Sequence, residues 1–336
     1  MKHIVIKRFL SPAFFVVLIF LIACNQDEKP TKPSSTGTPS EIVVVSENNL
    51  WASSAGDTVQ VFFAGPVPGL PQPEPFYKLI QVKEDAFGNL LKLHRNIFII
   101  TIDSSMQEPL LEMRQDIWAS PQRVVKISSA SVEGIKETFE ANKEKILNMY
   151  DNGEVDRLHK LYAKSKNIEA ISVIEKKFGF SLNIPADYYQ AVEKDNFIWL
   201  RRETNVESQG IMIYTYPYTD TVAFRSAKIE SIRDQFTQLY VPGPSDSSFM
   251  AIANEFVTPI SRSISFKNQT ATELRGLWEV RKDFMGGPFI SYTFVDERNN
   301  LVVTLDGYVY APNSPKLALL KQVQSVLLSF KYIDNK

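Results

Sequence analysis

The chain has 336 residues, with 37 basic and 38 acidic side chains and a single cysteine, Cys24. This charge balance argues against a nucleic-acid partner, and the sequence contains no basic stripe that would bind one. A single cysteine excludes an internal disulfide and a thiolate metal cluster. The two histidines in the body of the chain, His94 and His159, are too few for a zinc or haem centre without carboxylate help. We therefore predict no metal and no cofactor.

The N-terminus predicts a secretion signal. Lys2, Lys7 and Arg8 precede 11 apolar residues, 13–23, which end directly before Cys24. A membrane span needs about 20 apolar residues, so this run has the length of a signal-peptide core. Residues 21–24, "LIAC", match the bacterial lipobox, in which the peptidase cuts before the cysteine and the thiol carries a diacylglycerol. We predict a signal peptide over residues 1–23 and a lipid anchor at Cys24.

A tether is predicted over residues 24–40. Its residues 25–40, "NQDEKPTKPSSTGTPS", contain no aliphatic or aromatic side chain, a composition that cannot bury enough surface to fold. Asn25 is not the aspartate that retains lipoproteins at the inner membrane, which favours the outer membrane, on its periplasmic side or at the cell surface. Asp27 and Glu28 resemble a surface-export signal, and a solvated charge pair explains them equally well.

Short β-branched and aromatic runs predict nine strands, at 41–46, 76–82, 96–102, 123–128, 197–202, 210–216, 276–281, 289–295 and 301–310. Apolar residues at helical spacing predict helices over 131–150, around 229–239 and over 314–330. Ser314 is the expected N-cap of the last helix.

A weak internal echo suggests a duplication. "GDTVQVFF…VPGLP" (56–71) resembles "TDTVAFRS…VPGPS" (219–245), and each half then ends with a strand and a long amphipathic helix. The predicted fold is α+β, with two related halves, each an antiparallel sheet covered by helices. The halves span residues 41–150 and 179–336, and a helical connector spans 151–178.

Several segments resemble an uncharacterised domain-of-unknown-function family of bacterial outer-membrane lipoproteins: "LPQPEP" (70–75), "RNIFI" (95–99), "FIWLRRE" (197–203), "RGLWEVRKDFMGGPF" (275–289) and "DGYVYAP" (306–312). This resemblance implies an outer-membrane lipoprotein of unknown activity and carries over no catalytic residue. The ending of the chain, from residue 299 to 330, is also similar to the last strand and helix of PsbP-like α/β/α sandwiches, which implies a non-enzymatic accessory or binding domain.

Tyrosine-rich strands are the main candidate contact face. Alternation along a strand places Tyr214, Tyr216 and Tyr218 on one side, and Tyr308 and Tyr310 share a side of another strand. Such rings suit a sugar or a protein interface, since each is apolar with a hydroxyl that can hydrogen bond. The alternative is that helices cover these faces and the tyrosines belong to the core.

Gly286 and Gly287, in "FMGGPF" (284–289), form a second candidate contact. Paired glycines allow close backbone approach to a ligand, although a tight connection between two strands explains them as well. The same alternation places Trp199, Arg201 and Glu203 on one face, where an arginine–carboxylate pair is expected.

Three classes of function remain open. The first is a non-enzymatic accessory or binding component of an envelope protein complex, held at the membrane by lipidated Cys24. The second is a glycan- or peptide-binding module that uses the tyrosine strands. The third is a carboxylate-based hydrolase, for which no pair of acidic residues can be assigned from the sequence. A nucleic-acid partner is not expected.

Overall fold

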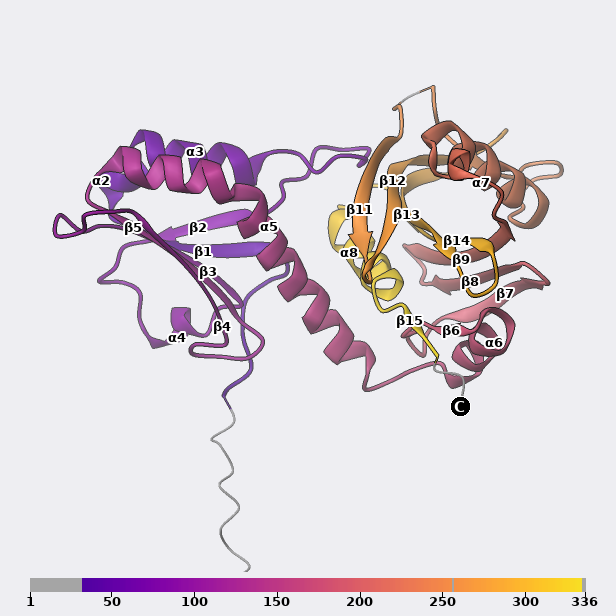
Figure 1. The fold of residues 1–336 in the computed structure, drawn as a ribbon, viewed down its shortest axis with the longest axis horizontal. Helices are drawn as coiled ribbons and strands as arrows, with labels where there is room; N and C mark the ends of the chain where they lie inside the picture. Colours follow the sequence, from indigo (N-terminus) through magenta and orange to yellow (C-terminus); the bar gives the residue numbers. More distant parts are fainter. Residues whose placement is uncertain (1–31, 256, 334–336) are drawn as a thin grey trace, which may run out of the picture.

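The computed structural model describes residues 32–255 and 257–333, which form two α+β domains linked by helix α5 (Figure 1). Cys24, the predicted signal peptide and the first part of the predicted tether lie outside the described residues. Among the helices that are described, none has the length and apolarity to cross a membrane. The α+β class is as the sequence predicts.

The N-terminal domain contains one five-stranded sheet in the order β2-β1-β3-β5-β4. Its strands are β1 (Glu41–Val45), β2 (Lys78–Val82), β3 (Asn96–Ile102), β4 (Leu110–Gln115) and β5 (Arg123–Ser129). Helices α2 (Asn48–Trp51) and α3 (Ser54–Ala64) connect β1 to β2, α4 (Asn89–Lys92) precedes β3, and α5 (Val132–Tyr162) follows β5. Apolar side chains of α3 and α5 pack on one face of the sheet and form the main core of this domain.

The N-terminal sheet differs from the antiparallel sheet predicted for this half. β1 pairs in parallel with both β2 and β3, β3 pairs in parallel with β5, and only β4 is antiparallel to its neighbour. The chain returns to the same end of the sheet through α2 and α3 before β2, through α4 before β3, and through the antiparallel β4 before β5, which makes parallel pairing possible. Because the other domain has an antiparallel sheet with a different strand order, the predicted duplication is wrong.

Part of the predicted tether is ordered against the N-terminal domain. The Thr36 N–H donates to the Leu93 carbonyl (2.8 Å), the Arg95 N–H donates to the Thr36 carbonyl (2.9 Å), and Ser120 N–H donates to the Pro33 carbonyl (2.9 Å). These bonds satisfy backbone groups of a segment that has no apolar side chain to bury. The expectation that residues 33–40 are a free tether is therefore wrong, and we call residues 33–37 the strap.

The C-terminal domain is built on an eight-stranded antiparallel sheet in the order β10-β12-β13-β14-β9-β8-β7, with β11 also paired to β12. Its strands are β7 (Tyr189–Lys194), β8 (Phe197–Glu203), β9 (Ser208–Pro217), β10 (Met250–Ile252), β11 (Ile260–Phe266), β12 (Gln269–Val280), β13 (Gly286–Asp296) and β14 (Leu301–Tyr310). A separate two-stranded sheet joins β6 (Phe180–Ser181) to β15 (Lys331–Tyr332).

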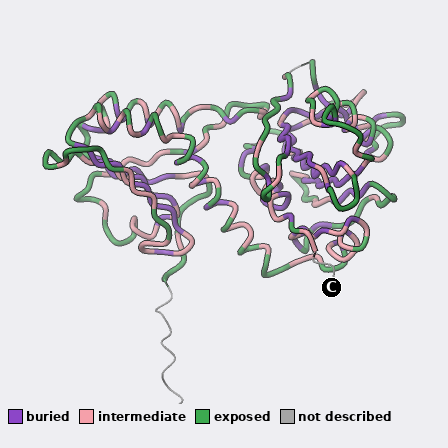
Figure 2. The backbone as a smooth tube through the Cα atoms, viewed as in Figure 1, coloured by how far each residue is buried: buried purple, intermediate pink, exposed green. Residues whose placement is uncertain are grey.

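Helices cover both faces of the large sheet. α6 (Ile168–Phe178) and α8 (Leu317–Leu327) pack on one face, and α7 (Ser226–Tyr240), preceded by the 3₁₀ turn η1 (Thr221–Phe224), packs on the other. Figure 2 shows that buried residues concentrate along the central strands between these layers. The antiparallel sheet covered by helices is as predicted for this half.

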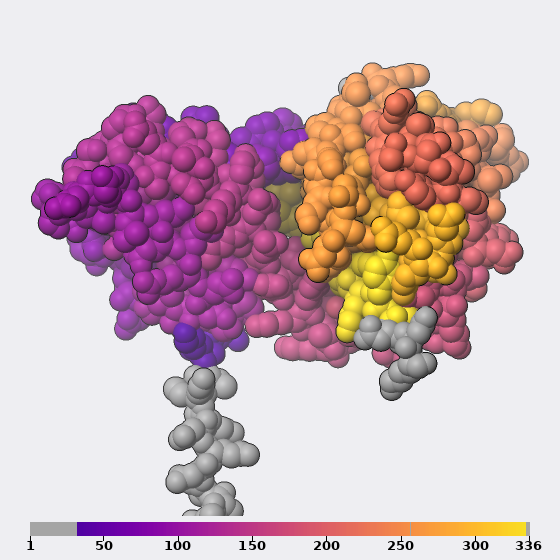
Figure 3. Space-filling view, viewed as in Figure 1, coloured from indigo at the N-terminus to yellow at the C-terminus, as the bar shows by residue number. Residues whose placement is uncertain are grey.

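Helix α5 joins the two domains. It continues without interruption through residues 150–151, where the sequence placed the start of a separate connector, and it is 31 residues long. The His159 Nε2 lies 2.7 Å from the carbonyl oxygen of Ser325 on α8, and the Lys321 ammonium lies 3.2 Å from the Asp151 carboxylate. In Figure 3 the domains form two lobes that meet along part of their facing sides.

A second connection is made by residues 66–75, which we call the arm. The arm leaves the N-terminal domain after α3, and its Leu70 packs against the C-terminal core. The Glu74 carboxylate accepts hydrogen bonds from the N–H groups of Lys316 (2.6 Å), the N-cap residue of α8, and Leu317 (3.1 Å), its first residue. The predicted cap, Ser314, is wrong: the helix starts at residue 317 and Glu74 satisfies its N-terminus.

Candidate ligand site

An aromatic pocket of about 400 Å³ opens on the C-terminal domain, on the same face of the sheet as α7. Strands β8, β12 and β14 contribute Trp199, Trp278, Tyr308 and Tyr310. Its other walls come from the loop after α7, from β10, from the end of β12 and from the loop before β13: Val241, Pro242, Gly243, Pro244, Met250, Val280 and Met285. Arg201 and Ser208 are the polar side chains that line it. We call it the aromatic pocket.

Two glycines allow the aromatic rings to cross neighbouring strands. Gly287 lies on β13, between Trp278 and Val309, and the Trp278 indole donates a hydrogen bond to the Val309 carbonyl (3.1 Å). A Cβ at Gly287 would lie 2.1 Å from that carbonyl oxygen. Gly210 on β9 likewise leaves room for the Tyr308 ring, because a Cβ at this position would lie 2.0 Å from a ring carbon of Tyr308. Small residues at these positions therefore create the floor of the pocket.

The rings of the floor are fixed to one another. The Trp199 indole N–H donates to the Tyr308 hydroxyl (3.1 Å), and the Trp278 and Tyr308 rings meet edge to face at 5.2 Å. Burial raises the pKa of Tyr308, so its hydroxyl stays protonated. Because this hydroxyl already accepts the hydrogen bond of Trp199, the pocket offers ligands mainly aromatic and apolar surface.

Arg201 supplies the charge at this site. Its guanidinium lies over the Trp199 ring, 4.8 Å from the centroid, and forms an ion pair with Glu203. This confirms the pair expected from strand alternation. The side chain is 29% exposed, which keeps part of the guanidinium accessible from the pocket. A cation stacked on a ring is held in a narrow range of positions, and it suits a carbonyl or carboxylate of a ligand.

The predicted tyrosine face separates into two parts. All five tyrosines lie on β9, β14 or directly after β9, but Tyr218 and Tyr310 are at opposite ends of the β9–β14 pair. Tyr214 is completely buried beneath α7 and stacks on Phe236 at 4.7 Å. It belongs to the core, so its prediction as a contact residue is wrong. Tyr216 is half-buried beside the same cluster.

Of these tyrosines, Tyr308 and Tyr310 line the aromatic pocket, the first as part of its buried floor. The candidate loop contact resolves differently: Gly286 and Gly287 begin β13 and pair with Glu279 and Trp278, so they belong to the ladder. They shape the pocket by leaving out side chains. The loop itself, residues 281–285, carries Phe284, whose side chain is fully exposed, and Met285, which lines the pocket.

Sequence reasoning missed Trp278 and the two prolines, Pro242 and Pro244. The Val-Pro-Gly-Pro run at 241–244 indicates a turn, and nothing local shows that this turn lies against β12. Trp278 stands in the segment that carries the family resemblance, so its position there was the available signal.

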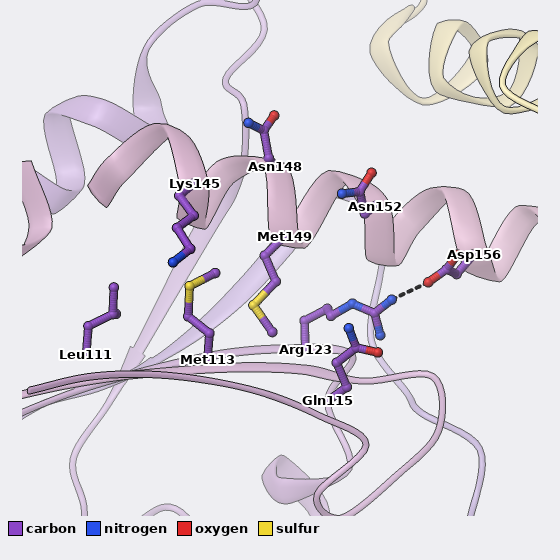
Figure 4. A pocket seen from close by; sticks show the side chains of 9 residues that line it. All are labelled: Leu111, Met113, Gln115, Arg123, Lys145, Asn148, Met149, Asn152 and Asp156. Atoms are coloured by element: carbon purple, nitrogen blue, oxygen red, sulfur yellow. Dashed lines mark hydrogen bonds and ion pairs between the residues drawn. The ribbon is translucent and has the colours of Figure 1, made fainter. Parts of the chain in front are cut away.

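A second concavity, of about 540 Å³, is a groove between β4 and α5 in the N-terminal domain. Figure 4 shows Lys145, Met149 and Asp156 on α5 facing Met113 on β4 and Arg123 on β5. The guanidinium of Arg123 is paired with the Asp156 carboxylate across the groove. Because this charged pair is closed on itself, we place the ligand site in the aromatic pocket.

The two histidines are separate from both sites. His94 is buried in the N-terminal domain, with its Nδ1 2.9 Å from the Asn96 carbonyl oxygen, and burial lowers its pKa. His159 contacts α8. Within residues 32–255 and 257–333, no three His, Cys, Asp or Glu side chains come together as a metal site would require.

Comparisons with known proteins divide the chain at the same place as the fold. Residues 35–163 match the model of a domain of unknown function (DUF8532), and residues 166–329 match that of another domain of unknown function (DUF4837). The resemblance to uncharacterised domains is therefore confirmed, although two separate domain families cover the chain where the sequence predicted one. No curated protein matches the chain.

Two solved structures share a weak likeness with this chain. Cyanobacterial PsbP (CyanoP) from Synechocystis sp. is 10% identical, with a TM-score of 0.32 over 46% of this chain and 87% of that one. The Ran-binding protein Mog1p of Saccharomyces cerevisiae is 8% identical, with a TM-score of 0.30 over 46% of this chain and 91% of that one. At these TM-scores the likeness gives no information about function.

Proposed function

We propose that this chain is a lipid-anchored, non-catalytic binding protein of the bacterial outer membrane. In this proposal, the aromatic pocket of the C-terminal domain holds a segment of another envelope protein. The observation that carries the proposal is the pocket itself: four aromatic rings from three strands line one concavity together with two prolines and two methionines. Pockets that bind ligands are mostly apolar with a few placed polar groups, here Arg201 and Ser208.

An extended, apolar or proline-containing peptide fits this surface best. Aromatic-lined grooves bind such segments because their rings pack against the flat faces of proline and aliphatic side chains. Arg201 is held on Trp199 at the wall of the pocket, where it can donate to a peptide carbonyl.

The exposed Phe284 supports a protein partner. It precedes Met285 of the pocket wall, and its side chain is fully exposed at the tip of the β12–β13 connection. A large aromatic side chain in water beside an apolar concavity is typical of an interaction site.

The anchor is argued from the sequence. The lipobox at residues 21–24 would place diacylglycerol on Cys24, and chains of this kind bind a bilayer stably when two or more are attached. Replacement by serine (Cys24→Ser) should leave the precursor uncleaved and without labelled lipid. Lipid incorporation into the serine variant would contradict the assignment.

The pocket is tested by crosslinking in cells. A photo-crosslinking amino acid at position 284 should trap a discrete envelope protein, and Tyr310→Ala should reduce that product at least fivefold by removing one wall of the pocket. Tyr218→Ala is the matched control, because Tyr218 is also half-buried but lies at the other end of the strand pair.

Equal loss in both tyrosine variants would overturn the proposal. Purified chain that instead retains a sugar oligomer on an oligosaccharide array, with loss of retention in Tyr310→Ala, would replace the peptide by a glycan.

A further inference from the structure

A concavity of about 620 Å³ lies between the two domains and is separate from the aromatic pocket. Its walls come from the strap, from the loops that carry Arg95 and Pro121, from the second half of α5, and from α8. Sites at domain boundaries are frequent places for small ligands. We call it the inter-domain cleft.

The inter-domain cleft is lined by five cationic side chains and one carboxylate. The cations are Arg95, Arg157, Lys160, Lys164 and Lys321, and the carboxylate is Glu154. Glu154 is shared, because its two oxygens lie 3.2 Å from the Arg95 guanidinium and 3.0 Å from that of Arg157. Lys321 has Asp151 as its partner.

Glu154 and Asp151 together neutralise two of these five positive charges, which leaves an excess of about three positive charges at the cleft. Lys160 and Lys164 are exposed and make no ion pair within the described part of the chain. The two arginines are held more tightly, with only 18% of the Arg95 side chain and 10% of the Arg157 side chain exposed. Charge of one sign in a partly buried concavity attracts a ligand of the other sign.

The two partly buried arginines show the same shortage of negative charge. Burial lowers the pKa of Arg157 to about 10, and although Glu154 opposes this, the neighbouring Arg95 and Arg123 add to it. The Arg95 Nε is buried and has no acceptor among the described residues. A buried N–H of a charged group without an acceptor is costly, and an anion in the cleft would offset part of this cost by its attraction to the guanidinium.

We propose that the inter-domain cleft binds a phosphate-bearing ligand and that this ligand joins the two domains. A phosphate dianion matches the uncompensated charge better than a single carboxylate does, and arginines bind its oxygens as a fork. The ligand would contact Arg95 and Arg157 from the N-terminal side and Lys321 and Gln322 from α8.

The phosphate can come from a free metabolite or from a lipid headgroup. Ser34 lines the cleft and follows Cys24 by ten residues, which an extended chain spans in at most about 36 Å. If Cys24 is the anchor, as the proposed function holds, the cleft stays within reach of headgroups. Binding of free phosphate does not depend on the anchor, so the two proposals can fail separately.

The test uses the full mature chain, residues 24–336, and three probes: inorganic phosphate, glycerol 3-phosphate, and phosphatidylcholine vesicles with and without phosphatidylglycerol. Calorimetry should show saturable binding of the soluble probes and a rise in melting temperature. In Lys160→Gln/Lys164→Gln the dissociation constant should rise at least tenfold, since these exposed lysines can be changed without disturbing the core.

Lys143→Gln/Lys145→Gln is the matched control, because it removes the same charge from the same helix outside the cleft and should leave the dissociation constant within twofold. Vesicle binding that requires phosphatidylglycerol, and that glycerol 3-phosphate displaces, would assign the headgroup as the ligand. Binding of the soluble probes alone would assign a free phosphate compound. Absence of saturable binding to every probe, or equal weakening in both double variants, would overturn the proposal.

Discussion

The carboxylate of Glu74 accepts a hydrogen bond from the backbone N–H of Leu317, which lies 243 positions later in the chain and in the other domain. Helix α8 has no capping side chain of its own, so its first N–H groups depend on the arm. Helix termini leave unsatisfied N–H groups that a carboxylate stabilises both as an acceptor and through the helix dipole. The arm therefore does for α8 what a local N-cap does for most helices.

Replacing Glu74 by alanine should lower the free energy of unfolding by about 1 kcal/mol, the usual contribution of a helix cap. Urea denaturation followed by circular dichroism measures it. Glu84→Ala, at an exposed loop position of the same domain, should change stability much less. If both variants unfold at the same urea concentration, Glu74 does not stabilise α8.

Gly287→Ala should destabilise the C-terminal domain by about 1–3 kcal/mol, because the added methyl group overlaps the Val309 carbonyl and crowds the Trp278 indole. Tryptophan fluorescence should report the displaced indole. Gly88→Ala serves as the control, since a Cβ there meets nothing closer than 4.0 Å. A stable Gly287→Ala variant with unchanged fluorescence would contradict the account of the pocket floor.

Asp306→Asn should be the most damaging of these changes. Arg233 on α7 and Asp306 on β14 are both completely buried, and the Arg233 Nε lies 2.8 Å from the Asp306 Oδ2. Burial alone would lower the pKa of Arg233, but the Asp306 carboxylate outweighs this and leaves the pKa raised. Removing the carboxylate leaves a buried charge unpaired, at a cost of about 3–5 kcal/mol.

Chemical denaturation of Asp306→Asn measures that loss. Glu133→Gln, which breaks an exposed pair with Lys136, is the comparison and should cost less than about 1 kcal/mol. Similar losses in the two variants would show that the buried pair is replaceable.

Removing the hydroxyl of Tyr150 and removing that of Tyr216 should have different effects on stability. The Tyr150 hydroxyl donates to the Ile97 carbonyl (2.9 Å), so Tyr150→Phe leaves a buried carbonyl without its donor and should cost about 1 kcal/mol or more. The Tyr216 hydroxyl is buried without a partner among the described residues, and burial raises its pKa to about 12. Tyr216→Phe should be neutral or stabilising. Calorimetric melting of both variants decides between these expectations, and a larger loss in Tyr216→Phe would contradict them.

Stability should fall on acidification because of His94. Burial lowers its pKa below the ordinary 6.5, and this effect exceeds the opposing effects of the Asn96 backbone hydrogen bond and of Glu41. The unfolded chain therefore binds the proton first, so this contribution is complete above pH 6.5 and is lost as pH falls through the folded pKa. The slope is at most about 1.4 kcal/mol per pH unit for one proton.

Denaturation of the parent chain and of His94→Asn between pH 7 and pH 5 tests this slope. The variant should be less stable at pH 7 and should lose less on acidification. An unchanged slope in the variant would assign the acid sensitivity to other groups. Because the strap pairs with Leu93 and Arg95 on either side of His94, its protection from hydrogen exchange should fall over the same range.

Strand positions were readable from the sequence, but their direction was not. Each of the nine strands predicted from β-branched and aromatic runs is present in the structure. Polar edge strands such as β7 and β11 gave no such signal. The "EIVVV" run of β1 is buried along nearly its whole length, a pattern typical of parallel strands covered on both faces. The alternating pattern of an antiparallel strand was absent there, and that absence was the available clue.

The candidate site was only partly predictable for a different reason. Tyr308 and Tyr310 were found because alternation within one strand is local information. Their neighbours Trp199, Trp278 and Pro242 come from elements that pairing and loop closure bring together, which no local pattern records. Glu74 capping α8 is the extreme case, since its partner lies in another domain.

Helix α5 ties the unfolding of the two domains together. Its first two thirds supply Ile135, Phe139 and Tyr150 to the N-terminal core, while its last residue, Tyr162, packs on the C-terminal core. Helices propagate cooperatively, so neither end can melt without weakening the hydrogen bonds that continue into the other. The chain should therefore lose its structure as one cooperative unit, and a protease that cuts within α5 should release two unstable halves.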